Sequence, residues 1–354
     1  MLRFAHCCRY SRREFLTGLA ALGAGATIPT GLSRGQTTTP ALRRVDIHHH
    51  FGSPDWVRMT AQRQSAGFEV WQKYSQARSI EDMDRAGVEV SYISITTPGI
   101  WFGDLAETRR LARRENEYGA RLAADSKGRL RLLAVLPLPD VEASLREIDY
   151  AFDTLKADGV GLLSNWGRQW LADAKFRPVL DELNRRGAVV YTHGSAPGCC
   201  GGDFVPGVVE TTIEYNTDVS RAIISLIVSG AADRTPNIRY VMSHGGGTII
   251  GLAGRFLRNE ASAESLTRTP EVNSRLHHLR RFYYDTAAST NPVIIEALKR
   301  MVAPSQILFG TDFPFGSAGA IAAAMRNTGL SEAEMAGVDR LNAERIYPYL
   351  RSAS

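Results

Sequence analysis

Cysteine is rare in this chain. Four of the 354 residues are cysteine, and they stand in two adjacent pairs, Cys7-Cys8 and Cys199-Cys200. Adjacent cysteines seldom form a relaxed disulfide, because that bond sets its two Cα atoms about 5.5 Å apart. We therefore predict no disulfide framework. Cys199 and Cys200 offer thiolates that a soft metal can bind, but a loop with two small, partly buried side chains is the simpler interpretation.

Long apolar segments and unbalanced charge are also missing from most of the chain. After residue 36, no segment offers about 18 consecutive apolar residues, so the sequence predicts no transmembrane helix. The formal net charge is +5, and five arginines against one glutamate place +4 of it before residue 36. The remaining charge of about +1 gives no reason to propose a nucleic-acid partner.

The first 36 residues have the pattern of a twin-arginine export signal. Arg12 and Arg13 are followed by Phe15 and Leu16, and residues 17–32 are rich in alanine, glycine and leucine. Such a signal addresses a protein for export and is removed from the mature chain. We expect cleavage near residues 33–40 and a periplasmic location. A basic N-terminus followed by a short apolar helix is the alternative.

The rest of the chain alternates strand patterns with helix patterns. Eight short apolar segments predict buried strands at residues 45–50, 88–95, 130–136, 159–164, 189–193, 238–244, 282–285 and 307–312. Helix patterns follow them at residues 79–87, 106–127, 141–157, 175–186, 217–231, 248–260, 291–302, 318–327 and 331–346. Eight such units predict a (β/α)8 TIM barrel over residues 43–350. An open doubly wound sheet is the alternative, but no Gly-x-Gly-x-x-Gly pattern follows the first strand.

Residues 52–78 show no regular pattern in the sequence. Trp56, Phe68, Trp71 and Tyr74 lie there among polar residues. A long irregular segment after the first strand is typical of a functional loop, such as a lid over the mouth of the barrel. Packing of these aromatic rings into the core is an equally good interpretation.

Histidine or aspartate ends four of the predicted strands. His48 and His50 close the first strand, His193 the fifth, His244 the sixth and Asp312 the eighth. Each of these is a weak signal alone. In a (β/α)8 barrel, however, all strand ends face one mouth, where active sites are built. The five residues are therefore expected to meet, although the chain separates them widely.

These residue types favour a site for one metal ion. Three imidazoles and one carboxylate suit Zn²⁺, with Mn²⁺ and Fe²⁺ as alternatives. We predict His48, His50, His193 and Asp312 as ligands, with a position left open for water or substrate. His244 precedes three glycines and is predicted to be a catalytic base. A phosphate-binding loop is the weaker interpretation, because no Lys-Ser or Lys-Thr pair follows.

Other histidines and acids have simpler explanations. His49 should point behind the first strand into packing, because side chains alternate along a strand. His277 and His278 lie in a basic segment that is typical of a solvated helix. Asp285 ends the seventh strand, where a structural hydrogen bond is a better interpretation than a place in the pocket.

The strand-end motifs resemble the amidohydrolase superfamily, in its aminocarboxymuconate-semialdehyde decarboxylase branch. The resemblance covers about residues 43–347 and rests on Asp46-Ile47-His48-His49-His50, Thr192-His193, Ser243-His244-Gly245-Gly246-Gly247 and Gly310-Thr311-Asp312-Phe313-Pro314. It implies a distorted (β/α)8 barrel, one divalent metal and non-oxidative decarboxylation, usually in a homodimer. The branch's metal ligands fall on His48, His50, His193 and Asp312, and its catalytic histidine on His244.

The resemblance also implies a substrate and a way of binding it. Residues 159–167 and 283–287 are most similar to 6-methylsalicylate decarboxylases, so a small aromatic or dienoic acid such as a 2-hydroxybenzoate is expected. The proton comes from Asp312 or from water held by His244. Arg255 is expected to reach the neighbouring subunit's pocket, where its planar guanidinium binds the substrate carboxylate. Trp166 either walls the substrate ring or packs in the core.

Two other functions fit the same residues. A mononuclear hydrolase or hydratase would direct hydroxide at a lactone, an amide or a double bond. The missing bridging carboxylated lysine argues against a binuclear hydrolase but not against a mononuclear one. An exported binding protein would keep the barrel without the chemistry, but the five intact strand-end residues argue against that function.

Overall fold

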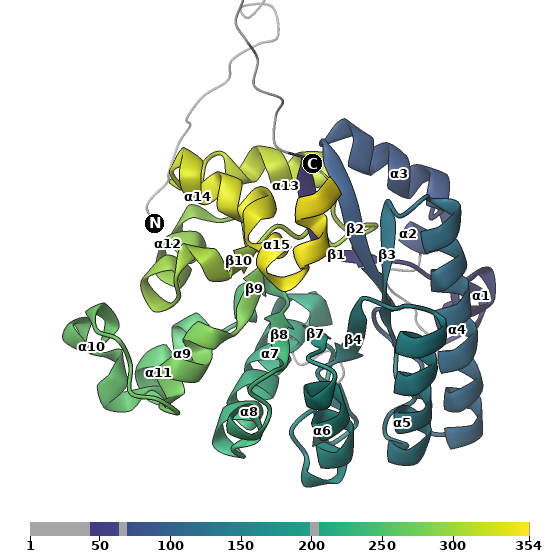
Figure 1. Cartoon of the computed structure of the whole chain (residues 1–354), viewed down its shortest axis with the longest axis horizontal. Helices are drawn as coiled ribbons and strands as arrows, with labels where there is room; N and C mark the ends of the chain where they lie inside the picture. The colour runs from purple at the N-terminus through teal and green to yellow at the C-terminus, as the bar shows by residue number, and fades with distance from the viewer. Residues whose placement is uncertain (1–42, 64–68, 199–204, 354) are drawn as a thin grey trace, which may run out of the picture. The chain divides into compact units, whose positions relative to one another are not determined.

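The computed structural model describes residues 43–63, 69–198 and 205–353. Eight parallel strands form the central sheet (Figure 1). In their order around the sheet these are β1 (Arg44–His50), β2 (Val88–Ser94), β3 (Leu130–Ala134), β4 (Gly159–Leu163), β7 (Val189–His193), β8 (Arg239–Met242), β9 (Tyr283–Asp285) and β10 (Ile307–Leu308). A separate hairpin joins β5 (Asn165–Trp166) to β6 (Gln169–Trp170).

The sheet closes on itself between β1 and the segment that follows β10. The backbone N–H of Ile47 donates to the carbonyl of Phe309 at 2.9 Å, and that of His50 donates to the carbonyl of Phe313 at 2.7 Å. An open sheet would leave β1 unpaired on this side. The predicted (β/α)8 barrel is therefore confirmed. Its shortest strand is β10, which has two residues.

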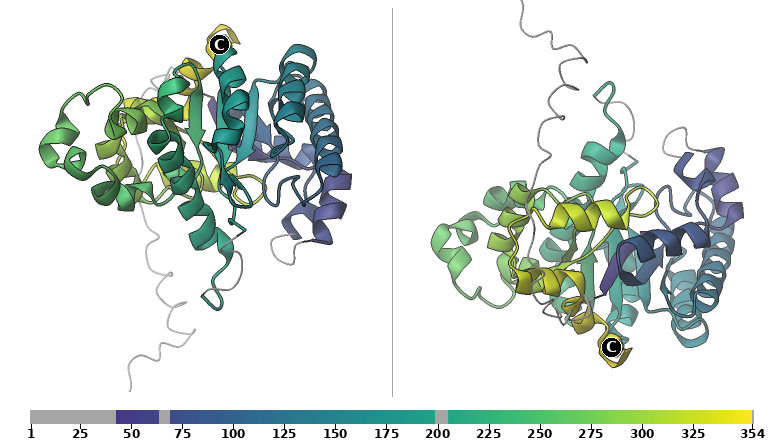
Figure 2. Two further views of the ribbon diagram at one scale, coloured as in Figure 1. Left: turned by 90° about the horizontal axis from the view of Figure 1, so that it is seen from below. Right: turned by 90° about the horizontal axis from the view of Figure 1, so that it is seen from above.

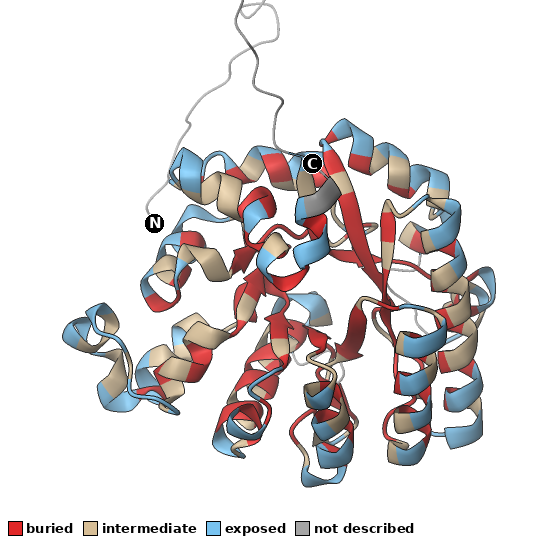
Figure 3. Cartoon of the chain, in the orientation of Figure 1, coloured by how far each residue is buried: buried red, intermediate tan, exposed pale blue. Residues whose placement is uncertain are grey.

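Helices surround the strands (Figure 2). Those that follow the strands are α3 (Gln76–Arg85), α4 (Leu105–Asp125), α5 (Val141–Asp149), α6 (Arg177–Arg185), α7 (Glu210–Val228), α9 (Ile249–Phe256), α12 (Pro292–Met301) and α13 (Ala318–Met325). Two shorter helices, α14 (Glu332–Ala336) and α15 (Ala343–Ile346), come near the C-terminus. Most strand residues are buried, whereas the helices alternate buried and exposed faces (Figure 3). This alternation is the amphipathic pattern that predicted the helices.

A cluster of apolar residues lies inside the barrel, apart from the larger apolar core. It takes Val45 and Ile47 from β1, Tyr92 from β2 and Tyr191 from β7, together with residues of other strands. Side chains from strands on all sides can meet only in the interior. Tyr347, from the C-terminal segment, stacks on Tyr92 with ring centroids 4.1 Å apart. The barrel is thus a packed core rather than a pore.

Residues 52–78 contain helices where the sequence predicted an irregular stretch. The described part of this segment holds α1 (Pro54–Ala61), α2 (Glu69–Gln72) and the start of α3. Trp56 and Trp71 are buried there, with ring centroids 5.2 Å apart. The core-packing interpretation is confirmed for these two rings, because each is enclosed by apolar neighbours. Phe68 lies outside the described residues.

Two helices begin earlier than the sequence predicted. The N-cap of α3 is Ser75, whose side chain accepts the N–H of Arg78. Ser79, the predicted cap, is buried within the helix and forms a 2.6 Å hydrogen bond with Nε2 of His49. Ser75 and Ser79 both have a hydroxyl that can cap a helix. The hydroxyl of Ser79 is used by His49 of β1, and Ser75 is the residue that caps α3. Similarly, α7 begins at Glu210 rather than at residue 217.

Two sequence predictions concern residues outside the described ranges. The export signal over residues 1–36 and the pair Cys199-Cys200 both lie outside the described residues. Within the described ranges, no helix combines the length and the apolar character that crossing a membrane requires.

Candidate metal centre

Four of the strand-end residues meet at one end of the barrel. One nitrogen or oxygen atom from each of His48, His50, His193 and Asp312 lies within 4.8 Å of the corresponding atoms of the other three. Nε2 of His48 is 3.0 Å from Nε2 of His50, and Asp312 Oδ1 is 3.2 and 3.1 Å from these two atoms. Residues more than 260 positions apart are thus in contact, as the barrel topology predicted.

The buried carboxylate of Asp46 fixes the strand that carries the first two histidines. Asp46 Oδ1 accepts the backbone N–H of His48 at 3.0 Å and that of Thr311 at 3.1 Å. Its Oδ2 accepts the hydroxyl of Thr311 at 2.7 Å. Asp46 therefore ties β1 to the residue immediately before Asp312. No separate role was predicted for Asp46.

The other ring nitrogen of each clustered histidine faces a hydrogen-bond acceptor. Nδ1 of His48 is 2.9 Å from Asp285 Oδ2, that of His50 is 3.3 Å from the carbonyl of Ser94, and that of His193 is 2.7 Å from the carbonyl of Gly194. If each Nδ1 carries the proton that it donates, each neutral ring keeps a lone pair on Nε2. This arrangement is typical of histidines that bind a metal.

The donor set fits a divalent metal ion. Asp312 Oδ1 is buried and, among the described residues, has no hydrogen-bond partner, although two imidazole nitrogens lie close to it. Lone pairs and a carboxylate oxygen that face one another without a proton between them repel, unless a cation lies among them. Three imidazole nitrogens and one carboxylate oxygen are a set that Zn²⁺ commonly takes, with a further position for water or substrate.

Burial and neighbouring charge set the protonation of the cluster. Burial lowers the pKa of His50 to about 4 and that of His193 well below its usual value, so both rings stay neutral. Burial would raise the pKa of Asp312, but the nearby imidazoles hold it well below its usual value. Burial also opposes a charge on His48, yet the carboxylates of Asp285 and Asp312 outweigh it and raise the pKa of His48 to about 10.

His244 lies beside the cluster but is not one of the four. Its ring centroid is 4.9 Å from that of His48 and 5.1 Å from that of His193. Its Nδ1 is 3.1 Å from the carbonyl of Ala287, so donation there leaves the lone pair on Nε2. An imidazole held in this way beside the cluster has the features of a general base.

The glycines after His244 allow the chain to turn close to α7. At Gly247, where φ is +66°, an added Cβ would come within 1.9 Å of the carbonyl oxygen of Asn216. A side chain cannot be placed there without moving the backbone of α7.

Asp285 links His48 to His244. Its Oδ2 accepts from Nδ1 of His48, and its Oδ1 accepts the backbone N–H groups of His244 and Ala287, both at 3.0 Å. The expected structural hydrogen bond is thus present. It also positions two residues of the candidate site, and that role was not apparent in the sequence. The position of Asp285 at the end of β9 was the signal that could have indicated it.

The remaining singled-out residues lie apart from the cluster. His49 turns away, as expected: Nδ1 is 3.0 Å from Asp46 Oδ2, and its ring stacks on Phe313. Arg255 is exposed on α9, and its side chain makes no hydrogen bond or ion pair with any described residue. The segment with His278 is the helix α11 (Arg275–Arg281), but a solvated His278 was wrong. That ring is buried, and its Nε2 is hydrogen-bonded to Asp233 Oδ1 at 2.8 Å.

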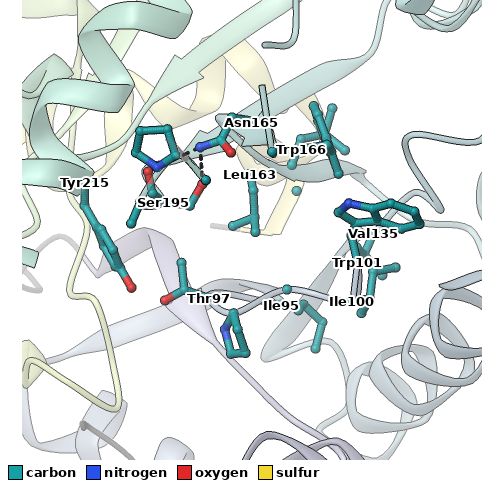
Figure 4. Close-up of a pocket in the computed structure, with 18 of the residues that line it drawn as sticks. Ile95, Thr97, Ile100, Trp101, Val135, Leu163, Asn165, Trp166, Ser195 and Tyr215 are labelled. Atoms are coloured by element: carbon teal, nitrogen blue, oxygen red, sulfur yellow. Dashed lines mark hydrogen bonds between the residues drawn. The ribbon is translucent and has the colours of Figure 1, made fainter. Parts of the chain in front are cut away.

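A cavity of about 400 Å³ opens at the same end of the barrel (Figure 4). Its walls come from the chain just after β2, β3, β4 and β7, and from Tyr215 on α7. The ring of Tyr215 lies 6.4 Å from that of His193, which places this wall next to the metal cluster. Trp166 lines the cavity and also packs edge-to-face on Phe176 at 5.3 Å. The structure therefore gives Trp166 both positions that the sequence left open.

Comparisons with known proteins agree with this geometry. A family model described as amidohydrolase matches residues 45–349. The 6-methylsalicylic acid decarboxylase of Penicillium expansum is 33% identical over 285 residues, which cover 77% of this chain and 85% of that protein.

Solved structures share the fold at lower identity. A 2,6-dihydroxybenzoate decarboxylase complexed with 2,6-dihydroxybenzoate matches with a TM-score of 0.76 at 21% identity, over 86% of this chain and 99% of that one. A dihydroxybenzoic acid decarboxylase from Polaromonas, with bound manganese, matches with a TM-score of 0.73 at 20% identity, over 86% and 97% of the two chains. The chain belongs to the amidohydrolase family, as its strand-end motifs predicted.

Proposed function

We propose that this protein is a metal-dependent decarboxylase of a small aromatic acid with a hydroxyl group next to the carboxylate, such as 6-methylsalicylate. The observation that carries the proposal is the convergence of three imidazole nitrogens and the Asp312 carboxylate beside a cavity. The 33% identity to a 6-methylsalicylic acid decarboxylase supports the reaction and the substrate class.

We assign the metal to His48, His50, His193 and Asp312, and we name Zn²⁺ or Mn²⁺ as the ion. The nitrogen-rich donor set favours Zn²⁺. The structural relative with bound manganese supports Mn²⁺. When bound, such an ion polarises the substrate's carboxylate and hydroxyl oxygens and stabilises the charge that develops on them.

The residues around the cluster supply the proton chemistry. Decarboxylation of an aromatic acid requires a proton on the ring carbon that bears the carboxylate. The carbon–carbon bond then breaks, its electron pair restores the aromatic ring, and CO₂ leaves. Asp312, or a water molecule held by Nε2 of His244, delivers that proton. The carbonyl of Ala287 holds Nδ1 of His244. Nε2 is therefore the nitrogen that takes up a proton and returns it in each cycle.

The homodimer and the role of Arg255 belong to the same proposal. Arg255 is exposed on α9 and has no ion-pair partner among the described residues, so its guanidinium is free to bind a carboxylate outside its own subunit. The expected result of Arg255→Ala is a raised KM for carboxylate substrates. An unchanged KM would remove Arg255 from the site.

We also propose that residues 1–36 direct export by the twin-arginine route to the periplasm. This route carries folded proteins, which suits a protein that takes up its metal before export. Replacing Arg12 and Arg13 together by lysine should leave the protein in the cytoplasm. Periplasmic recovery of that variant would contradict the proposal.

A substrate panel tests the reaction. Metal-loaded protein is given 6-methylsalicylate, related 2-hydroxybenzoates and a set of lactones. We expect CO₂ and the corresponding phenol, which is 3-methylphenol from 6-methylsalicylate. Release of acid from a lactone, without CO₂ from any benzoate, would instead indicate the hydrolase. Saturable binding without turnover would indicate the binding protein.

A further inference from the structure

The cavity beside the metal cluster has a polar end and an apolar end. Tyr215, Ser195 and Thr97 gather on one side in Figure 4. The polar side is the one nearest the metal cluster, because Ser195 follows His193 by two residues and the ring of Tyr215 lies against that of His193. A ligand held at the metal therefore enters the cavity at its polar end.

Buried hydrogen bonds fix the polar end in place. The side-chain amide of Asn165 donates to Ser195 Oγ at 2.9 Å and to Asp218 Oδ2 at 2.7 Å. Asp218 is fully buried, and its Oδ1 accepts the indole N–H of Trp170 at 2.8 Å. These bonds hold Asn165 and Ser195 in one orientation, so this wall is preorganised and does not rearrange to make room for a ligand.

The opposite end of the cavity is apolar. Figure 4 shows Ile100, Trp101, Val135 and Trp166 there, on the side away from Tyr215, with Leu163 between the two ends. Leu163 ends β4 and pairs in register with His193. Of the described residues that line the cavity, Glu210 alone carries a charged side chain. The far end therefore favours a hydrocarbon group over a second carboxylate.

The cavity is larger than a single substituted ring requires. A cavity of about 150 Å³ is enough to hold benzene. The volume of about 400 Å³ leaves more than half of the space for other parts of a ligand. A methyl group would fill little of that space, and the apolar walls around it would stay in contact with water.

We propose that the preferred substrate is an aromatic acid that carries an apolar substituent longer than methyl, and that this substituent lies between Trp101, Val135 and Leu163. The inference rests on the proposed function, because it takes the carboxylate end of the substrate to lie at the metal cluster. It adds the substrate class that this chain selects.

Chain length is the variable that tests the proposal. Turnover is measured for 2-hydroxybenzoates that carry methyl, propyl or pentyl at ring position 6, and for the same series at position 4. Each methylene that enters the apolar end should raise kcat/KM by about fourfold in one of the two series. A kcat/KM that is flat or falls from methyl to pentyl in both series would overturn the proposal.

Variants of Leu163 locate the effect. Leu163→Trp should fill the middle of the cavity and lower the ratio of kcat/KM for pentyl over methyl by at least about tenfold. Leu163→Ala should move the preferred length to a longer chain. Leu105→Trp, at an exposed position at the start of α4, is the matched control and should leave the ratio unchanged. Equal ratios in all three variants would contradict the assignment.

A binding measurement separates this proposal from the reaction. The 3-alkylphenols, which both series give when the carboxylate is lost, are titrated into metal-loaded protein while tryptophan fluorescence is recorded. Binding that tightens with chain length, without any CO₂ release from the acids, supports the cavity inference and contradicts the decarboxylase. Binding of the same strength at every length contradicts the cavity inference, whatever the turnover.

Discussion

The direction in which each imidazole donates decides what the histidine cluster can bind. Asp285, the carbonyl of Ser94 and the carbonyl of Gly194 each face one Nδ1 atom. When a neutral ring donates its Nδ1 proton to that acceptor, its lone pair is left on Nε2. A cluster with the opposite tautomers would present N–H groups to the same space and would favour an anion. The acceptors behind the rings therefore matter as much as the rings.

The separation of roles between His244 and the four proposed ligands can be tested by truncation. His244→Ala should keep one metal ion per chain, because His244 is outside the four-residue group, but should lower kcat by about 10²–10⁴-fold through loss of the base. Metal content and turnover are measured on the same preparation. His277→Ala, a partly exposed histidine on α11, is the control. Loss of the metal from His244→Ala would show that His244 is a metal ligand.

Asp285 is expected to act through His48. In Asp285→Asn, an amide N–H can take the place of the oxygen that accepts from Nδ1 of His48. Nδ1 would then accept a hydrogen bond, so the ring proton of His48 would lie on Nε2, where it competes with the metal. We expect metal affinity to fall by about 10–100-fold. Asp233→Asn is a matched control, because Asp233 holds His278 with a similar bond of 2.8 Å but away from the cluster. An equal effect of both variants on metal affinity would reduce Asp285 to a structural role.

The pH dependence of metal binding follows from His48. Because its pKa is raised to about 10, the metal-free site carries a proton there at neutral pH, and the metal must displace it. The apparent Kd for Mn²⁺ should therefore rise about tenfold for each pH unit lost between about pH 9 and pH 7. Titration of metal-free protein at several pH values measures this slope. A Kd that does not change over that range would show that no proton is displaced.

The proposed ligands were predictable from the sequence, but their supporting residues were not. His193, His244 and Asp312 each come at the end of a short apolar run, and His48 and His50 close the first predicted strand, so their position at a strand end is visible in the sequence. The roles of Asp46 and Asp285 depend on hydrogen bonds to residues about 265 and 237 positions away. Asp285 ends β9, which places it at the mouth of the barrel, but the local pattern does not show which distant groups such an acid will bind.

At the level of elements, strands were easier to predict than helix starts. β3, β4 and β8 are runs of mostly buried apolar residues, and such runs are typical of strands inside a barrel. A helix start depends on one capping side chain, and the chain near α3 offers both Ser75 and Ser79. The aromatic residues of 52–78 gave no periodic pattern because α1 and α2 are short, with eight and four residues.

Close packing constrains the backbone of the loop after β8 at Gly247. Gly247→Ala should lower the free energy of unfolding by about 2 kcal/mol or more, because the new Cβ meets the carbonyl of Asn216 and φ is positive. Gly251→Ala is the control on α9, where an added Cβ meets nothing within 4 Å and should stabilise the helix by about 0.5–1 kcal/mol. Urea unfolding measures both. Equal stabilities would contradict the close approach.

At the level of the whole molecule, closure of the barrel creates the site. His48 and Asp312 belong to the first and last strand units, and the hydrogen bonds from β1 to Phe309 and Phe313 bring them together. The sequence predicted this closure by counting eight strand and helix units. It could not predict the cavity, whose shape depends on the loops after β2, β3, β4 and β7 and on Tyr215.

The central claim is that one divalent ion, held at this junction of the first and last strand units, is required for decarboxylation. The direct test follows 6-methylsalicylate by NMR in D₂O with metal-loaded protein, with chelated protein and with protein reloaded with Mn²⁺ or Zn²⁺. We predict 3-methylphenol with one deuterium at the carbon that lost the carboxylate, no product after chelation, and recovery with one equivalent of metal. Full turnover by the chelated protein, or unchanged substrate with every metal tested while a lactone is hydrolysed, would contradict the claim.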